Sequence, residues 1–181
     1  ISILSGQVKS RLIKQPETVE PILDKINESA IKMNDSLQDL VWAVKPENDT
    51  LQELLVRMEQ FASGILESKN INYTFTGPTT VSDIKLNPEL IRNIYLIFKE
   101  AVNNAAKYSN CANVTITIKE KGKQLSLSVI DDGIGFNPET VKRGNGLNNM
   151  TKRAAQIGGS LNIISEPNKQ SGIVLECKIT S

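Results

Sequence analysis

The first quarter of the chain carries hydrophobic residues at alternating steps of four and three positions. This spacing is held for more than three heptads, which is typical of a helix in a coiled coil or helical bundle. Pro46 ends the predicted helix, and residues 1–13 have the pattern of a preceding helix, joined to it by a turn at 14–17. The repeating positions are Val19, Leu23, Ile26, Ala30, Met33, Leu37, Leu40 and Val44.

A single helical hairpin of this size cannot cover its own hydrophobic stripe. A second copy of the chain would cover it, so the pattern favours a homodimer through the N-terminal helices, closed as a four-helix bundle. The alternative is a helix that packs on the neighbouring domain of its own chain.

From about residue 48 the pattern alternates between helical and strand periods. Thr50 is a predicted helix cap with Glu53 three residues later, and Pro88 is a predicted helix start. The expected order is a helix at 50–69, a strand at 71–76, a helix at 88–108, a hairpin of 114–118 and 125–129, a helix at 147–157, and a hairpin of 161–165 and 173–179. Strands this close in sequence predict an α+β fold, a two-layer α/β sandwich with helices on one face of a mixed sheet. The expected domains are 1–46 and 47–181.

The composition narrows the chemistry. The 181 residues are 39% hydrophobic and 23% charged with a formal net charge of +1, so direct nucleic-acid binding is not indicated. The chain has no histidine, which removes imidazole zinc sites and serine–histidine–aspartate triads. Cys111 and Cys177 lie in segments predicted as strands, with no CxxC pair, which indicates buried reduced thiols of a cytoplasmic protein.

Four polar side chains share one side of the predicted 88–108 helix. Glu100, Asn104, Lys107 and Tyr108 stand at i, i+4, i+7 and i+8, which clusters them within about a quadrant beside the buried stripe. Carboxylate and amide oxygens suit Mg²⁺, and a lysine can contact phosphate. A solvated helix face with a charge pair would show the same pattern.

Two glycine-containing segments follow. In 131–135, Asp131 ends a strand and can accept a hydrogen bond from an exocyclic amine such as that of adenine, although an ordinary Asp-Gly turn has the same sequence. In 144–147, Gly144 and Gly146 precede a helix whose free N–H groups favour phosphate. A glycine turn before a helix is also common without any ligand.

In this order the three segments resemble the nucleotide-binding boxes of the Bergerat-fold ATPases, the superfamily of DNA gyrase, Hsp90, histidine kinases and MutL. EAVNNAAKYS is similar to the N box, DDGIGF to the first glycine box and GNGLNNM to the second. They most resemble sensor histidine kinases of the subfamily usually paired with LuxR-type response regulators. LVWAVKPENDTLQEL resembles the linker between the helices and the kinase domain of that subfamily, so the resemblance covers nearly the whole chain.

The resemblance implies ATP and Mg²⁺ as ligands, with a role for each matching residue. Asn104 is similar to the family's Mg²⁺ ligand, with Glu100 as a candidate second ligand. Glu100 also resembles the acidic residue that activates the acceptor histidine as a base. Lys107 and Tyr108 resemble the pair that contacts phosphate and nucleotide.

The resemblance extends to the two glycine boxes. Asp131 matches the adenine-reading aspartate, while Gly133 and Gly135 shape the pocket and its lid. Gly144 and Gly146 match the phosphate-side glycines, and Leu147 joins them as a nucleotide-binding residue.

Three departures from the family pattern stand out. The family often has Thr after the glycine of the last hairpin, where Ile173 follows Gly172, so a hydroxyl near adenine is missing or is supplied by Ser171. The lid expected at 136–143 is short. The acceptor histidine is absent, because in the family it lies about three turns before the stretch that ISILSG resembles. The chain starts without Met, so we expect a fragment with the histidine upstream; the alternative is a natural pseudokinase.

The expected function is the ATP-binding catalytic domain of a two-component sensor histidine kinase. The parent would transfer the γ-phosphoryl group to its histidine and then to a response-regulator aspartate, whereas this fragment would not autophosphorylate. The alternatives are a gyrase- or Hsp90-like ATPase, and a non-enzymatic nucleotide-sensing scaffold. We expect a cytoplasmic location, with room for a membrane anchor upstream.

Overall fold

The computed structural model describes residues 50–79, 85–137 and 145–179, together with scattered positions between 19 and 41. The chain divides into two compact units, Ile1–Trp42 and Ala43–Ser181, close to the expected boundary at 46. In the first unit, all described positions from Pro21 to Val41 are helical. Among the seam residues, Leu23, Met33 and Leu37 are exposed. Leu40, Val44 and residues 1–18 lie outside the described residues, so the dimer stays a prediction.

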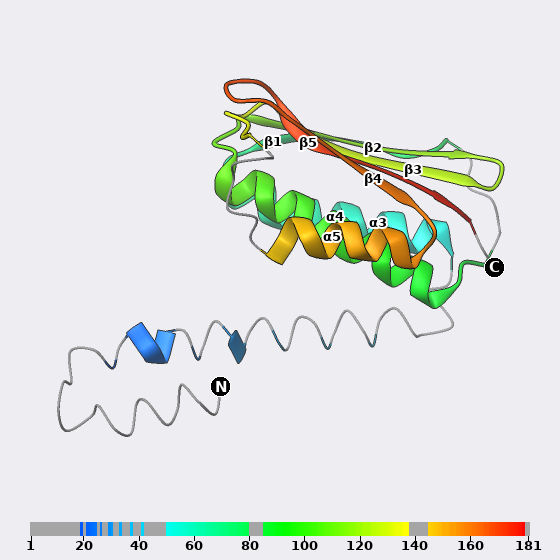
Figure 1. The fold of residues 1–181 in the computed structure, drawn as a ribbon, viewed down its shortest axis with the longest axis horizontal. Helices are drawn as coiled ribbons and strands as arrows, with labels where there is room; N and C mark the ends of the chain where they lie inside the picture. Colours follow the sequence, from blue (N-terminus) through cyan, green and yellow to red (C-terminus); the bar gives the residue numbers. More distant parts are fainter. Residues whose placement is uncertain are drawn as a thin grey trace. The chain divides into compact units, whose positions relative to one another are not determined.

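The second unit is a two-layer α+β sandwich, as predicted, with its described helices on one face of a five-stranded sheet (Figure 1). Its elements are α3 (Leu51–Glu67), β1 (Asn72–Thr76), α4 (Pro88–Tyr108), β2 (Asn113–Lys121), β3 (Gln124–Asp131), α5 (Asn145–Gln156), β4 (Ser160–Ser165) and β5 (Ser171–Lys178). None of the helices in the described part of the chain is long and apolar enough to cross a bilayer.

The sheet is mixed, with the strand order β1-β2-β3-β5-β4. β1 and β2 are parallel, because α4 carries the chain back across the sheet between them, and the other pairs are antiparallel. β3 therefore lies at the centre of the sheet. Its last residue, Asp131, pairs with Val114 of β2 on one side and with Ser171 of β5 on the other.

Local sequence signals set the helix starts. Thr50 caps α3 by accepting a hydrogen bond of 3.2 Å from the Glu53 amide, and Asn87 caps α4 by accepting one of 2.8 Å from the Glu89 amide, with Pro88 in the first turn. The helix predicted at 50–69 ends at Glu67. The chain turns there because Asn70 takes a left-handed φ of 56°, and β1 starts at Asn72.

Alternating burial of the strands fixes which face of the sheet meets the helices. Every second residue of β2, β3 and β5 points to α3, α4 and α5, while the intervening residues are mostly polar and lie on the opposite face. The buried strand positions are Val114, Ile116, Ile118, Leu125, Leu127, Val129, Ile173, Leu175 and Cys177. Burial of this apolar surface is the main source of the fold's stability.

The two cysteines differ in their surroundings. Cys177 is buried in β5, where desolvation raises the pKa of its thiol to about 11. The prediction that Cys111 lies in a strand is wrong: it lies half-buried in the turn between α4 and β2. The Ser109 side chain accepts a hydrogen bond of 3.2 Å from the Cys111 amide, and Asn110 has a left-handed φ of 53°, so the chain is still turning there.

Candidate functional site

A cavity of about 630 Å³ opens between the second half of α4, the start of α5 and the ends of β3 and β5. It brings together residues from all three segments that the sequence singled out. Those that line it are Glu100, Asn104, Tyr108, Asp131, Gly135, Gly146 and Leu147. These residues are far apart in the sequence, but the fold brings them together because α4 and α5 pack side by side under the same strands.

Not every predicted residue lines this cavity. Lys107, in the last turn of α4, is exposed and is not one of its lining residues, and Gly133 is not one either. Tyr108 lies at the rim, with 73% of its surface exposed. Gly144 and most of the expected lid lie outside the described residues.

Asp131 is a buried polar group of the cavity that is held by two hydrogen bonds. It is 5% exposed, at the end of the central strand β3. Its Oδ1 accepts a hydrogen bond of 3.0 Å from the Gly133 amide, and its Oδ2 accepts one of 2.8 Å from the hydroxyl of Ser171, which is also buried. Each carboxylate oxygen keeps a further lone pair for a ligand. The buried carboxylate is therefore fixed in position and still able to accept hydrogen bonds.

The loop that follows Asp131 is held between two parts of the fold. On one side, the Ile134 amide donates a hydrogen bond of 2.8 Å to the Ser109 carbonyl at the end of α4. On the other side, the Phe136 amide donates one of 2.7 Å to Ser165 Oγ, and the Ile134 carbonyl accepts one of 2.7 Å from the Asn168 amide. These contacts fix the mouth of the cavity. Sequence reasoning missed Ser109 and Ser165, whose only signal was the serine preference for helix ends and turns.

The two glycines of this loop allow close packing. A Cβ on Gly133 would lie 2.2 Å from the Ser109 carbonyl oxygen, so this glycine lets the loop approach α4. Gly135 has a φ of +59°, and a Cβ there would lie 2.1 Å from the Glu166 carbonyl oxygen. Gly135 thus lets the loop pack against the β4–β5 turn. The sequence did not predict this contact.

Asp132 differs from its neighbour Asp131 in both its exposure and its structural role. Its side chain is exposed, and its Oδ1 accepts hydrogen bonds of 2.9 Å from the amides of Ala112 and Asn113. Its Oδ2 accepts one of 2.7 Å from the Asn113 side chain. The hydrogen bonds from Asn113 lower the pKa of the Asp132 carboxyl below its usual value. Asp132 thus joins the loop to the start of β2 and is not a lining residue of the cavity.

Glu100 and Gly146 meet between α4 and α5. A Cβ on Gly146 would lie 2.0 Å from Glu100 Oε1, so only glycine leaves room for this carboxylate at the start of α5. Arg153, two turns further along α5, donates a hydrogen bond of 3.3 Å to the buried Asn93 of α4. Thus α5 packs closely against the helix that carries Glu100 and Asn104, through Gly146 in its first turn and Arg153 in its last turn.

The floor of the cavity is apolar. It is formed by side chains that the sequence pattern assigned to the hydrophobic core, namely Ala101, Ala105, Val129, Met150 and Ile173. Nothing in the hydrophobic periodicity separates a core residue that touches only protein from one that faces a cavity. An apolar floor with one fixed carboxylate beside it suits an apolar heterocycle that carries an amino group.

The opposite end of the cavity can receive anions and a metal ion. The backbone N–H groups in the first turn of α5 have no partner within the helix itself, as at any helix start, and such groups favour phosphate. Glu100 and Asn104 lie one turn apart on α4 and supply carboxylate and amide oxygens. The described residues contain no cluster of three or more histidine, cysteine, aspartate or glutamate side chains. Glu100 and Asn104 suit Mg²⁺, which proteins often hold with one or two oxygen ligands while phosphates supply others.

The chain belongs to the family described as histidine kinase-, DNA gyrase B-, and HSP90-like ATPases, whose model matches residues 89–181. Sensor histidine kinase LiaS from Bacillus subtilis (strain 168) is 35% identical over 100 residues, which cover 55% of this chain and 27% of LiaS. An uncharacterized sensor-like histidine kinase from Chloroflexus aurantiacus is 25% identical over 188 residues, covering 100% of this chain and 32% of that protein. The chain thus spans about a third or less of these curated relatives.

Solved structures of histidine kinases share the fold. Acinetobacter baumannii histidine kinase AdeS matches with a TM-score of 0.66 and 16% identity, covering 99% of this chain and 95% of that one. The catalytic domain of histidine kinase ThkA matches with a TM-score of 0.60 and 18% identity, covering 72% of this chain and 94% of that one. The chain therefore carries an ATPase domain of the histidine kinase type, and the family implies a nucleotide as its ligand.

Proposed function

We propose that this chain is the ATP-binding catalytic part of a sensor histidine kinase, and that its parent phosphorylates a histidine and then a response-regulator aspartate. The observation that carries the proposal is the cavity itself. A fixed buried carboxylate stands at one end, Glu100 and Asn104 stand at the other, and an apolar floor joins them. The named relatives, both sensor-type histidine kinases, support the parent's activity.

Asp131 recognises adenine in this proposal. Its carboxylate accepts a hydrogen bond from the exocyclic amine of the base, while Ser171 and Gly133 hold it in place. A guanine in the same position would present a carbonyl oxygen to the carboxylate, and two acceptors repel each other. In this proposal, Ser171 supplies the hydroxyl near adenine that a Thr after Gly172 often supplies in the family. Ile173 at that position therefore does not weaken adenine binding.

The phosphates lie at the start of α5. The N–H groups around Gly146 and Leu147 would contact them, and Gly144 is expected to do the same, while Asn104 would hold Mg²⁺ with Glu100 as a candidate second ligand. Mg²⁺ would neutralise charge on the phosphate oxygens. Tyr108 covers the nucleotide at the rim. Lys107 is exposed as the structure stands, so its contact with phosphate requires its flexible side chain to turn toward the cavity.

Because the 181 residues contain no histidine, the reacting histidine would be supplied from outside them. One imidazole nitrogen forms a bond to the γ-phosphorus while the bond to the β–γ bridging oxygen breaks, which leaves ADP. Glu100 accepts a hydrogen bond from the other imidazole nitrogen and takes up its proton as positive charge develops on the ring. The phosphoryl group then passes to an aspartate of the response regulator, and the histidine is regenerated.

The partners follow from the kinase proposal. The N-terminal helices pair with those of a second copy, which covers the exposed seam residues Leu23, Met33 and Leu37. The sequence resemblance favours a response regulator with a LuxR-type output domain. A membrane anchor upstream of a cytoplasmic kinase region fits a sensor role.

Calorimetry with a non-hydrolysable ATP analogue and Mg²⁺ tests nucleotide binding by the chain as it is. We expect the ATP analogue to bind and the corresponding GTP analogue to bind more weakly. Asn104→Ala should bind the ATP analogue more weakly than the wild-type chain does, because the metal loses a ligand. Absence of binding to the wild-type chain would contradict the proposal.

A longer form of the protein that includes the preceding residues tests the phosphoryl transfer. Labelled phosphate should appear on a histidine, as an acid-labile and base-stable adduct, and Glu100→Gln should slow its appearance. Steady release of inorganic phosphate with no phosphohistidine would instead favour the gyrase-like ATPase. Binding with neither activity would favour the scaffold.

A further inference from the structure

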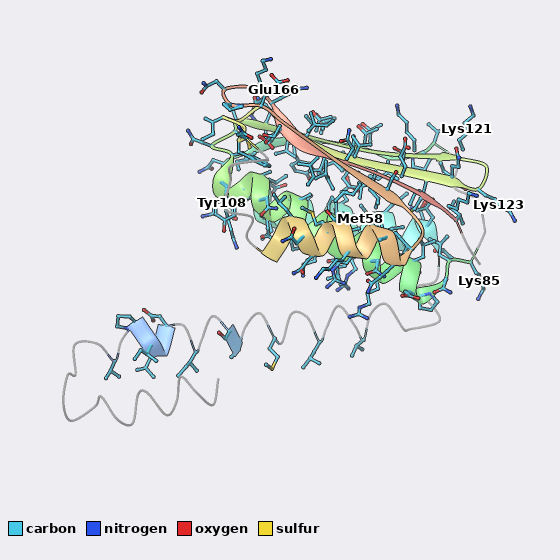
Figure 2. All side chains as sticks on the ribbon, in the orientation of Figure 1. Met58, Lys85, Tyr108, Lys121, Lys123 and Glu166 are labelled. Carbon is cyan, nitrogen blue, oxygen red and sulfur yellow. The ribbon has the colours of Figure 1, made fainter. Side chains whose placement is uncertain are left out.

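A second hollow lies at the far end of the sheet from the nucleotide cavity. Its volume is about 590 Å³, and it is lined by side chains of β2, β3 and β5 and by the turn before β4. Figure 2 shows Lys121 and Lys123 at this end of the sheet, away from Tyr108 and Glu166. We name it the lysine groove, defined by Lys119, Lys121, Lys178, Gln124, Ser126, Ser160 and Glu176.

The polar and charged residues that define the lysine groove lie on the face of the sheet that the helices leave open, whereas Leu125 and Cys177, which also line the hollow, are buried toward the helices. The neighbouring residues Ile118 and Cys177 are buried, so Lys119, Lys121 and Lys178 point to the opposite face. Lys121 and Lys178 flank Gln124 in register on three adjacent strands, which places their backbones about 10 Å apart. Lys119 lies two residues from Lys121 on the same strand, about 7 Å away.

The charge of the groove is positive and not neutralised within the described part of the chain. Lys119, Lys121 and Lys178 are exposed, and none of them has a described carboxylate within ion-pair distance. Glu176 is the one acidic residue lining the groove. Lys123 in the adjacent turn adds a further exposed cation.

We propose that the lysine groove docks an acidic segment of a partner protein, independently of the nucleotide cavity. Cations spread over about 10 Å across three strands match successive carboxylates of an extended chain better than they match one compact anion. The side chains of Gln124, Ser126 and Ser160 supply hydrogen bonds to such a segment.

Two other polyanions fit the groove less well. Its lining has no arginine and no aromatic side chain, which sequence-tolerant nucleic-acid binding uses for stacking and bidentate phosphate contacts. No exposed large hydrophobic residue lines it, whereas peripheral membrane binding inserts such residues between lipids. An acidic protein segment needs neither feature.

Fluorescence anisotropy with a labelled glutamate-rich peptide of about ten residues tests the proposal on the full chain. The test variant is K121Q/K178Q. The matched control is K69Q/K152Q, which removes the same charge from two exposed lysines outside the groove. We expect the test variant to weaken binding about fivefold or more and the control by less than about twofold, because only the groove lysines contact the peptide. Glu176→Gln should strengthen binding, and added salt should weaken it.

Three outcomes would overturn the proposal. The first is no peptide binding by the wild-type chain at low salt. The second is equal weakening in both double variants, which would mean attraction by net charge alone. The third is that the wild-type chain binds single-stranded DNA, or vesicles with about a third phosphatidylserine, more tightly than it binds the peptide, and that this binding is lost in K121Q/K178Q. Unchanged nucleotide affinity and thermal unfolding in each variant show that the fold is intact and keep the nucleotide site out of the result.

Discussion

The Ser171 hydroxyl donates a hydrogen bond of 2.8 Å to Oδ2 of Asp131 from the directly paired position on the neighbouring strand. Both residues are 5% exposed, so the bond forms away from bulk water. Such a carboxylate is already oriented before a base arrives, and binding does not have to order it.

Ser171→Ala removes this donor and leaves Asp131 Oδ2 short of a partner. We expect nucleotide affinity to fall about fivefold, which corresponds to about 1 kcal/mol for one hydrogen bond, together with a similar loss in the free energy of unfolding. Ser171→Thr keeps the hydroxyl and should retain most of the affinity. Calorimetry and urea unfolding measure the two effects, and equal behaviour of the Ala and Thr variants would show that the hydroxyl has no part in binding.

Asp131→Asn keeps the shape of the side chain but removes its charge and replaces one acceptor with a donor. We expect adenine nucleotide affinity to fall at least about tenfold, because the amide NH₂ cannot accept the exocyclic amine. The neighbouring Asp132→Asn is the matched control, since Asp132 is exposed and bonds to the start of β2. The control should keep nucleotide affinity, and an equal loss in both variants would contradict the role of Asp131.

The stability of the domain should depend on the ionisation of Asp132 in acid. Hydrogen bonds from Asn113 lower the folded-state pKa of this carboxyl. The contribution of the Asp132 carboxylate to the free energy of unfolding is therefore present above the unfolded-state pKa near 3.8, and it is lost as the pH falls through the folded-state pKa. Urea midpoints measured downward from pH 5 should therefore fall less steeply in Asp132→Asn than in the wild-type chain. Parallel curves for the two proteins would show that the Asp132 hydrogen bonds do not favour its charged form.

Gly146→Ala should act through Glu100. The new Cβ overlaps the end of a flexible side chain, so Glu100 moves away from α5 and the free energy of unfolding changes by less than about 1 kcal/mol. Mg²⁺-dependent nucleotide affinity should fall. In Glu100→Ala there is nothing to displace, so a double-mutant cycle should give a coupling energy of about 0.5 kcal/mol or more. Additive effects would mean that the two residues act separately.

The two thiols should react at different rates. Burial raises the pKa of both thiols, but Cys111 is only half-buried in a turn, whereas Cys177 is buried in β5 with its pKa raised to about 11. Only a thiolate reacts rapidly, so a disulfide reagent at pH 8 should label Cys111 first, and Cys177 only as the domain unfolds. Mass spectrometry of the labelled chain identifies which thiol has reacted.

The raised pKa of Cys177 also makes the stability of the fold depend on pH. Because the folded-state pKa of Cys177 is raised, its contribution to the free energy of unfolding is complete below the unfolded-state value near 9 and is lost as the pH rises through about 11.

The sequence predicted the layers of the fold and one side of the cavity because both follow from periodicity. Alternation in 113–131 and the stripe of 88–108 fix which side chains are buried, and helical spacing places Asn104 beside Glu100. Contacts between distant segments carry no such signal. The hydrogen bonds that the amides of the glycine loop donate to Ser165 Oγ and to the Ser109 carbonyl depend on how two turns meet, and Cys111 lies outside a strand because a C-cap turn intervenes. Lys107 has the right angular position on α4 but is not a lining residue of the cavity.

The close approach of Gly146 to Glu100 constrains how this protein can evolve. One small volume is shared by two positions 46 residues apart in sequence, so neither can change freely while the other stays the same. A side chain at 146 is compatible only with a shorter or displaced side chain at 100, and a lineage that loses the carboxylate at 100 also loses the steric reason for glycine at 146. Among related sequences, substitutions at these two positions should therefore appear together, and their joint loss would mark descendants that lack the phosphoryl transfer proposed for this site.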